Sequence, residues 1–306
     1  MDYSKCELCP RGCGVNRNGG EKGFCGAGSE MKIYRYGPHF GEEPPFTGEN
    51  GSGTVFFSHC TLGCEFCQNF PWSQQGQGET YTSEAFADIL IELAKQKCHN
   101  WNLVSPTCWL PDVKNGLETA KKAGFSLPLL YNTSGFECEQ SIDDMSGIVD
   151  IYVTDLRYSK KESAQLLSKS GDYVEVARNA LLKMVDQVGH LKCDADGSAI
   201  SGVVCRLLVL PGRADEAIDN LRWLEENVGT DMHISLMSQY VPAYNACKFQ
   251  DMGRTVNEDE YEAVCDVVEK LEFYNGWIQD FMPDLEVDKE LVGYNMESGG
   301  SAESKV

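Results

Sequence analysis

Short apolar runs alternate with amphipathic stretches along the chain after residue 50. Six of these runs are short and continuous enough to predict buried strands. Between and after them, apolar residues recur at the i, i+3, i+4 and i+7 spacing of one helix face, in residues 83–93, 215–228 and 258–272, and Ser83 is a candidate N-cap. The expected strands are Thr54–Phe57, Trp101–Val104, Leu127–Tyr131, Ile148–Thr154, Val203–Leu210 and His233–Met237.

This alternation predicts an α/β fold with a parallel sheet and right-handed crossovers. Six units are fewer than the eight of a closed barrel, so we expect a partial (β/α)6 barrel over residues 51–282. A Cys-rich, loop-dominated metal-binding segment precedes it (residues 1–50), and an acidic C-terminal tail follows (283–306), which we expect to be mobile. In such barrels the chemistry gathers at the carboxyl ends of the strands.

Composition narrows the class of protein. The 306 residues carry 47 acids and 26 bases, a net charge of -21 that disfavours nucleic-acid binding. No apolar run is long enough to span a membrane, and the N-terminus lacks a secretory signal pattern, so we expect a cytoplasmic protein. Disulfides are rare in that compartment, and the 14 cysteines are therefore expected to be metal ligands, catalytic thiols or core residues.

Three cysteines follow the first expected strand at C-x3-C-x2-C spacing, namely Cys60, Cys64 and Cys67. Three thiolates on one loop can ligate three irons of a 4Fe–4S cluster. The next cysteine is Cys98, so one iron is left open to bind another molecule. A structural zinc site is the weaker interpretation, since it normally needs four ligands.

The residues around these cysteines resemble a known family. Residues 43–48 (E-P-P-F-T-G), 51–58 (G-S-G-T-V-F-F-S) and 60–69 (C-T-L-G-C-E-F-C-Q-N) are similar to the radical S-adenosylmethionine superfamily, and within it to the uncharacterised branch related to pyruvate formate-lyase activating enzyme. The resemblance implies an oxidoreductase that works anaerobically. It would cleave S-adenosylmethionine reductively at the 4Fe–4S cluster, and the 5′-deoxyadenosyl radical would take hydrogen from a substrate. Flavodoxin or ferredoxin would supply the electron.

The resemblance also implies residues that bind S-adenosylmethionine. Phe66 stands where the family packs an aromatic ring on the adenine, and residues 105–107 (S-P-T) replace a Gly-Gly-Glu-type motif that binds the methionine amine. Independently of the family, Arg206 lies on an apolar strand, and a buried arginine needs a partner. The expected cofactor-binding residues are Phe66, Ser105, Thr107, Asn132, Asp155, Arg157 and Arg206.

A second set of cysteines lies near the N-terminus. Cys6, Cys9, Cys13 and Cys25 are separated by two, three and eleven residues, and four glycines between the last two permit tight turns. Four ligands suit either a second iron–sulfur cluster or a structural zinc ion. The remaining cysteines are expected in the core, and radical transfer by Cys108 or Cys247 at the barrel mouth is a further hypothesis.

Three functions fit these observations. The first is radical modification of a protein, with a glycyl radical enzyme as the substrate that the family implies. The second is radical chemistry on a small molecule or peptide. The third is a non-catalytic iron–sulfur electron-transfer protein, against which the open iron argues.

Overall fold

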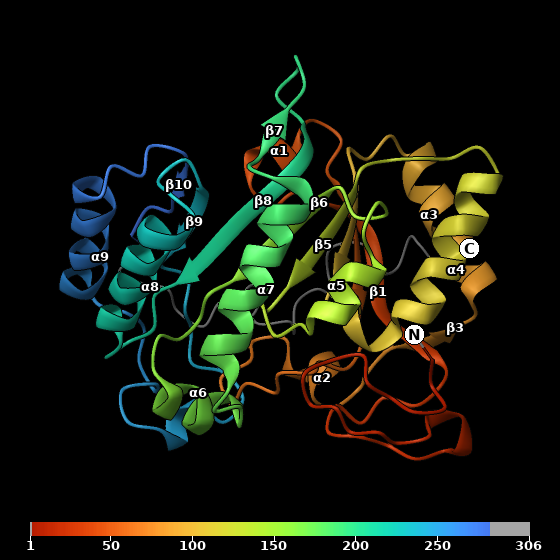
Figure 1. The fold of residues 1–306 in the computed structure, drawn as a ribbon, viewed down its shortest axis with the longest axis horizontal. Coiled ribbons are helices and arrows are strands. Elements are labelled where there is room, and N and C mark those ends of the chain that lie inside the picture. Colours follow the sequence, from red (N-terminus) through yellow and green to blue (C-terminus); the bar gives the residue numbers. More distant parts are fainter. Residues whose placement is uncertain (1, 282–306) are drawn as a thin grey trace.

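Strands form at all six expected apolar runs. These strands build a sheet, and helices cover one face of it (Figure 1). The computed structural model describes residues 2–281. Along the sheet the strands follow the order β10-β9-β8-β6-β5-β4-β2-β1-β3, and β7 pairs with β8. The strands are β1 Met31–His39, β2 Ser52–Phe57, β3 Glu79–Tyr81, β4 Trp101–Val104, β5 Leu129–Thr133, β6 Ile151–Asp155, β7 Lys192–Cys193, β8 Ala199–Leu208, β9 His233–Met237 and β10 Gly276–Ile278.

The predicted α/β class and parallel sheet are confirmed. Strands β2, β4, β5, β6, β8 and β9 are parallel, and β10 adds a seventh parallel strand beside β9. Among the described residues, β3 and β10 at the two ends of the sheet do not pair with each other, which is the open edge of a partial barrel. The seventh strand was not expected because three residues are too few for a periodic pattern.

The N-terminal part of the chain contributes to this sheet. Strand β1 pairs antiparallel with β2 and with β3. The loop-dominated part therefore ends near residue 30 rather than residue 50. We call residues 2–30 the N-terminal segment; apart from the 3-10 turn η1, it has no helix or strand. The expected acidic tail lies outside the described residues.

The helices lie mainly between the strands, as expected. Thr82, rather than Ser83, caps α3, because its extended backbone lets its hydroxyl accept from the Ala85 N–H, while Ser83 is the first helical residue. The helices are α1 Pro44–Thr47, α2 Phe70–Ser73, α3 Ser83–Lys95, α4 Leu110–Lys122, α5 Glu139–Asp144, α6 Lys161–Ser168, α7 Tyr173–Val188, α8 Ala214–Asn227 and α9 Glu258–Lys270, with 3-10 turns η1 Arg17–Gly19, η2 Pro106–Trp109 and η3 Ala246–Lys248.

A short plug closes one end of the barrel interior. Helix α1 places Phe46, which is fully buried, in an apolar cluster with side chains of β5, β6 and β8 such as Leu130, Val153 and Val204. Figure 1 shows α1 at the end of the molecule opposite to the N-terminal segment. The carboxyl half of the barrel interior is therefore left for a pocket.

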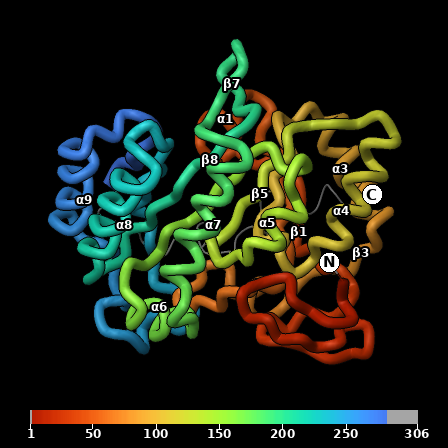
Figure 2. Tube along the Cα trace, viewed as in Figure 1, coloured from red at the N-terminus to blue at the C-terminus, as the bar shows by residue number. Residues whose placement is uncertain are grey.

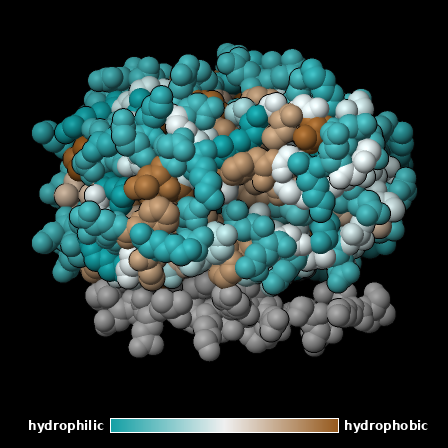
Figure 3. All heavy atoms as spheres, turned by 90° about the horizontal axis from the view of Figure 1, so that it is seen from below, coloured by the Kyte–Doolittle hydropathy of each residue, from teal (hydrophilic) through white to brown (hydrophobic). Residues whose placement is uncertain are grey.

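The N-terminal segment lies at the end where α2 and α6 lie (Figure 2). Arg11 fixes it there: its guanidinium donates to the carbonyls of Thr61 and Leu62 at 3.1 and 2.9 Å, and to those of Ser168 and Lys169. The face seen in Figure 3 is mostly hydrophilic with scattered apolar patches. Within residues 2–281, no helix has the length and hydrophobicity to cross a membrane.

Candidate active site

The loop that carries Cys60, Cys64 and Cys67 leaves β2 at its carboxyl end; we call residues 59–69 the cluster loop. Its backbone turns sharply, with φ of 70° at His59 and 75° at Gly63. A side chain at Gly63 would also bring its Cβ to 2.9 Å from the Phe24 ring. Glycine is therefore required here both for the backbone conformation and for the approach of the N-terminal segment.

Two sulfur atoms of the cluster loop receive hydrogen bonds from neighbouring groups. Backbone N–H groups of Leu62 and Gly63 donate to the sulfur of Cys60. The sulfur of Cys67 lies 3.2 Å from the Ser73 hydroxyl. Burial raises the pKa of both thiols, to about 12 for Cys67.

The third sulfur is paired with a cation. Arg157 donates to the Cys64 sulfur at 3.0 Å and to the Asp155 carboxylate at 2.6 Å, and the Ser168 hydroxyl lies 3.2 Å from the same sulfur. Burial alone would lower the pKa of Arg157, but Cys64 and Asp155 raise it well above its usual value. A permanent charge therefore stands beside the cluster loop and at the wall of the pocket.

Three cysteine sulfurs that receive hydrogen bonds form a donor set that fits an iron–sulfur cluster. Among residues 2–281, no group of three or more His, Cys, Asp or Glu side chains is arranged to hold one metal ion. A cluster is larger than one ion, so its cysteine ligands stand further apart. Hydrogen bonds to the sulfurs are a usual way in which proteins tune such clusters, and all three sulfurs have one here.

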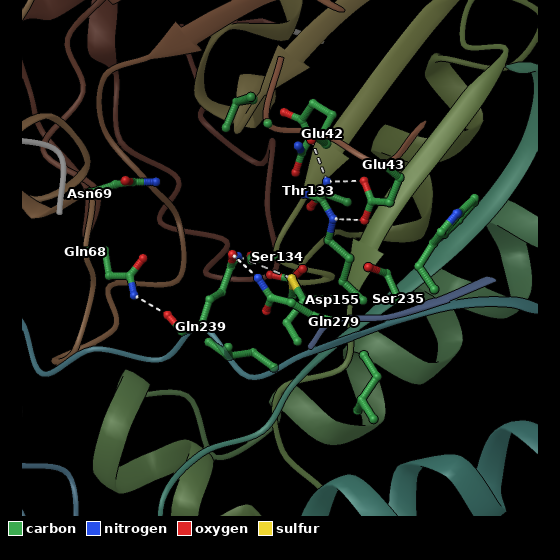
Figure 4. A pocket seen from close by; sticks show the side chains of 18 of the residues that line it. Glu42, Glu43, Gln68, Asn69, Thr133, Ser134, Asp155, Ser235, Gln239 and Gln279 are labelled. Carbon is green, nitrogen blue, oxygen red and sulfur yellow. Dashed lines mark hydrogen bonds and ion pairs between the residues drawn. The ribbon is translucent and has the colours of Figure 1, made fainter. Parts of the chain in front are cut away.

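A polar pocket of about 600 Å³ occupies the carboxyl half of the barrel. In Figure 4, Glu42 and Glu43 lie on one side of it, and Gln68, Asn69 and Gln239 lie on the other. Gln68 and Asn69 follow directly after Cys67, so the pocket opens beside the cluster loop. The pocket is therefore suited to hold a molecule that contacts the cluster loop on one side and Glu42 and Glu43 on the other.

An ion-pair network forms the deep end of this pocket. Arg206 donates to Glu43 at 2.8 and 2.5 Å and to Glu42 at 2.5 Å (Figure 4). Burial would raise the pKa of Glu43, but Arg206 lowers it, so the carboxyl is ionised at neutral pH. Asn102 also donates to Glu42. Two carboxylates face one guanidinium, which leaves excess negative charge.

Five of the seven expected cofactor-binding residues line the same pocket. Ser105 has a left-handed backbone, with φ of 56°, directly before Pro106. Such strain at a strand end is common where a ligand binds. Their binding of S-adenosylmethionine stays a prediction. The five residues are Ser105, Asn132, Asp155, Arg157 and Arg206.

Two expected residues do not line it. Phe66 is 3% exposed and packs its ring 5.8 Å from that of Tyr240. Thr107 is 3% exposed and donates to the Glu137 carboxylate at 2.7 Å. Both side chains point into the protein core in this structure, so contact of either with a cofactor would require a rearrangement.

Arg206 has a partner that the sequence did not reveal. The need for a partner was expected, but Glu42 and Glu43 were not assigned to the site. They directly precede the Pro44–Pro45 pair at the start of α1. Because α1 packs inside the barrel, Glu42 and Glu43 face Arg206 on β8. Two features of the sequence could have indicated this pairing: a buried arginine that requires a carboxylate, and two adjacent acids before a Pro-Pro helix start.

The N-terminal cysteines lie beside the cluster loop, outside the pocket. Cys9 and Cys25 are partly buried and Cys13 is exposed. His59 is half-buried, and its ring contacts the Cys25 carbonyl at 2.9 Å. Neither Cys108 nor Cys247 lines the pocket: the first is buried and the second is exposed.

Sequence comparison finds one curated relative without an assigned activity. The chain is 27% identical over 280 residues to the uncharacterized protein MJ0674 of Methanocaldococcus jannaschii, covering 88% of this chain and 75% of that protein. No protein-family model matches.

Solved structures give weaker similarities. They include HydG, a maturase of the [FeFe]-hydrogenase (TM-score 0.48, 15% identity, 77% of this chain and 53% of that one), and methylornithine synthase PylB (0.47, 17%, 79% and 69%). The protein anSMEcpe with bound AdoMet follows (0.45, 12%, 70% and 57%). The chain thus spans about half of HydG. At TM-scores below 0.5 these similarities do not establish a shared function.

Proposed function

We propose that this protein is a radical S-adenosylmethionine enzyme whose 4Fe–4S cluster is held by Cys60, Cys64 and Cys67. A reduced cluster with an open iron supplies the electron that cleaves S-adenosylmethionine to methionine and a 5′-deoxyadenosyl radical. The observation that carries the proposal is the cluster loop itself. Its three sulfurs each have a hydrogen-bond donor, it has no fourth cysteine, and it borders the pocket.

The pocket walls supply groups that suit the two ends of an amino acid. Arg157 presents a permanent positive charge beside Cys64, and a guanidinium pairs well with a carboxylate. Asn132 and Asp155 add polar side chains on the neighbouring strands β5 and β6. We assign these residues to binding and orienting S-adenosylmethionine, together with Ser105, which directly follows β4.

Arg206 has a different role in this proposal. Because it already pairs with Glu42 and Glu43, its charge is not free for a cofactor carboxylate. The excess carboxylate at the deep end of the pocket favours a substrate group that donates hydrogen bonds or carries positive charge. A small molecule or a peptide segment is therefore the substrate that we favour.

An activating-enzyme-like reaction is the second candidate. The resemblance of residues 43–69 favours it, with a glycyl radical enzyme as the protein substrate. A glycyl radical detected by EPR on a co-expressed partner would support this narrower function. Its absence from candidate partners, together with turnover of a small molecule, would exclude it.

The assay for the general proposal is anaerobic incubation with dithionite and S-adenosylmethionine. Wild-type protein is expected to form 5′-deoxyadenosine, and the Cys60→Ala, Cys64→Ala and Cys67→Ala variants are expected to form none. Cys98→Ala, which removes a buried thiol away from the loop, serves as the control. No 5′-deoxyadenosine from iron-loaded wild type would refute the proposal.

A further inference from the structure

Sulfur atoms from two distant parts of the chain meet outside the pocket. The thiol of Cys108, in η2 after β4, shares a hydrogen bond with the sulfur of Cys25 in the N-terminal segment, in which Cys108 is the donor when Cys25 is a thiolate. Cys9 interacts electrostatically with both Cys25 and Cys13. None of these four side chains lines the pocket, so the proposed reaction does not account for their arrangement.

A buried cation stands beside these sulfurs without a carboxylate partner. Arg17 is 2% exposed and donates to the carbonyls of Gly28 and Cys108, both at 2.7 Å. Its Nη1 lies 3.9 Å from the Cys6 sulfur, and Cys25 also lies within electrostatic range. Within residues 2–281 Arg17 forms no ion pair, and its Nη2 has no hydrogen-bond partner.

Aromatic rings hold this guanidinium in place. The Tyr3 ring lies 4.1 Å from it and the Trp109 ring lies 4.9 Å from it. The Tyr3 hydroxyl is in turn fixed by Asp112 at 2.6 Å. A buried charge is unfavourable unless it is compensated, so an ordered one implies an anionic neighbour. Thiolates of the N-terminal cysteines are the groups placed to supply that negative charge.

The N-terminal segment packs directly on the cluster loop. The His59 ring contacts the Cys25 carbonyl at 2.9 Å, and His59 precedes Cys60 in the chain. Arg11, two residues after Cys9, donates to the carbonyls of Thr61 and Leu62. A centre on the N-terminal cysteines would therefore lie beside the first cluster, separated by a few side chains.

This position favours a redox centre over zinc. Zinc has one oxidation state, and four thiolates must approach it to about 2.3 Å. The hydrogen bond from Cys108 to the Cys25 sulfur is of the kind that adjusts the reduction potential of a cluster.

We propose that Cys6, Cys9, Cys13 and Cys25 hold a second iron–sulfur cluster that relays electrons to the first. One electron passes from a low-potential carrier protein to the second cluster, which becomes reduced. The same electron then passes to the cluster on the cluster loop, and the second cluster returns to its oxidised form. Arg17 compensates the negative charge of the second cluster, and Cys108 is a positioning residue for its ligand Cys25. The relay rests on the proposed function, but the existence of the second cluster does not.

Metal analysis tests the second cluster without any activity assay. A Cys60/Cys64/Cys67→Ala variant, purified anaerobically and reconstituted with iron and sulfide, is expected to retain about four irons and four sulfides and an EPR signal when reduced. Stoichiometric zinc in place of iron, or no metal, would overturn the proposal. If circular dichroism shows that this variant is unfolded, wild type decides: about eight irons support the proposal and about four contradict it.

The role of Cys108 is tested by redox titration. Cys108→Ala removes a hydrogen bond to a cluster ligand, so the second EPR signal is expected to keep its intensity and to move to a lower midpoint potential. Cys98→Ala removes a thiol of similar burial elsewhere in the core and is expected to leave the potential unchanged. Equal potentials for the Cys108 variant and wild type would exclude this role.

The relay is tested by comparing two electron donors. Flavodoxin with its reductase is the protein donor, and dithionite is a small donor that can reach the first cluster directly. A Cys9/Cys25→Ala variant is expected to show at least a tenfold fall in the ratio of flavodoxin-driven to dithionite-driven 5′-deoxyadenosine formation. An unchanged ratio would overturn the relay, while failure of wild type with both donors would instead refute the proposed function.

Discussion

At the scale of single residues, Arg157 links the cluster loop to the pocket. It contacts the sulfur of Cys64 and the carboxylate of Asp155, and it lines the cavity. Among the described residues, removing its charge leaves the Cys64 sulfur with the Ser168 hydroxyl as its remaining donor and leaves Asp155 without its cation. The arginine is thus expected to matter both for the cluster and for the bound cofactor.

We predict that Arg157→Met lowers 5′-deoxyadenosine formation about 10- to 100-fold, the usual effect of removing a group that contacts a metal ligand. Arg157→Lys keeps the charge but loses the two-sided geometry, so it is expected to restore only part of the activity. Iron content and product yield are measured in parallel. Full activity of the Met variant would contradict the assigned role.

Glu137 is a buried carboxyl with an unusual protonation equilibrium. Its Oε1 accepts from Thr107 and Thr133, while Oε2 has no hydrogen-bond partner within residues 2–281. Burial raises its pKa to about 7. The folded protein therefore holds a proton that the unfolded chain releases above about pH 4.3. Stability from this group is present below that pH and is lost as the pH rises through about 7.

We predict that Glu137→Gln removes this pH dependence. The free energy of unfolding of wild type should fall relative to that of the variant by up to about 3 kcal/mol between pH 4.5 and pH 7.5. Anaerobic urea titrations of both proteins at several pH values measure the difference. Parallel pH profiles would show that Glu137 is not protonated in the folded protein.

At the scale of elements, the start of α9 is an example of local sequence determining local structure. Asn257 caps the helix by accepting from the Glu260 N–H, and the Glu260 carboxylate accepts from the Asn257 N–H. Arg254 also pairs with Glu260 at 2.6 Å. This hydrogen-bond and ion-pair network, Arg254 foremost, lowers the pKa of Glu260 to about 2.

We predict that Asn257→Ala destabilises the protein by about 1 kcal/mol, as expected for the loss of an N-cap.

Because the folded pKa of Glu260 is depressed, the stability that Glu260 contributes is present above about pH 4.3 and is lost as the pH falls toward 2. Glu260→Gln should therefore destabilise at neutral pH and have less effect near pH 2. Thermal unfolding measured at both pH values checks this, and an equal effect at both would contradict it.

The sequence predicted the elements that have strong local signals. Trp101–Val104 and His233–Met237 were predicted with correct bounds, and α9 begins at the expected Glu258. Strands β1, β3 and β10 were missed because tertiary pairing, rather than apolar periodicity, stabilises them: β3 pairs three residues with β1 along the sheet edge. The spacing of Cys60, Cys64 and Cys67 is also visible in the sequence because the three lie on one short loop, and their binding of a cluster stays a prediction.

Long-range partners were not readable from the sequence. Arg206 meets Glu42 and Glu43 across more than 160 residues, and Arg17 reaches the carbonyl of Cys108 across 91. Nothing local at either end specifies the pairing. The family resemblance assigned Thr107 and Phe66 to the cofactor-binding site, whereas both side chains are packed in the core of this structure. Only the fold shows which way a side chain at a strand end points.

At the scale of the whole molecule, the chain brings two sets of cysteines and a polar pocket to the same end of an open barrel. The cluster loop lies between the N-terminal cysteines and the pocket. In our account, electrons arrive through the N-terminal segment, and the cofactor and substrate bind in the pocket. Helix α1 closes the other end, so ligands enter at the carboxyl ends of the strands.

The central claim is that the cluster on Cys60, Cys64 and Cys67 has an open iron that binds S-adenosylmethionine. The most direct test is the EPR spectrum of the dithionite-reduced protein, recorded before and after S-adenosylmethionine is added at low temperature. We expect the signal that is lost in the Cys60/Cys64/Cys67→Ala variant to change its g-values when S-adenosylmethionine is added. A spectrum that is identical with and without S-adenosylmethionine would contradict it.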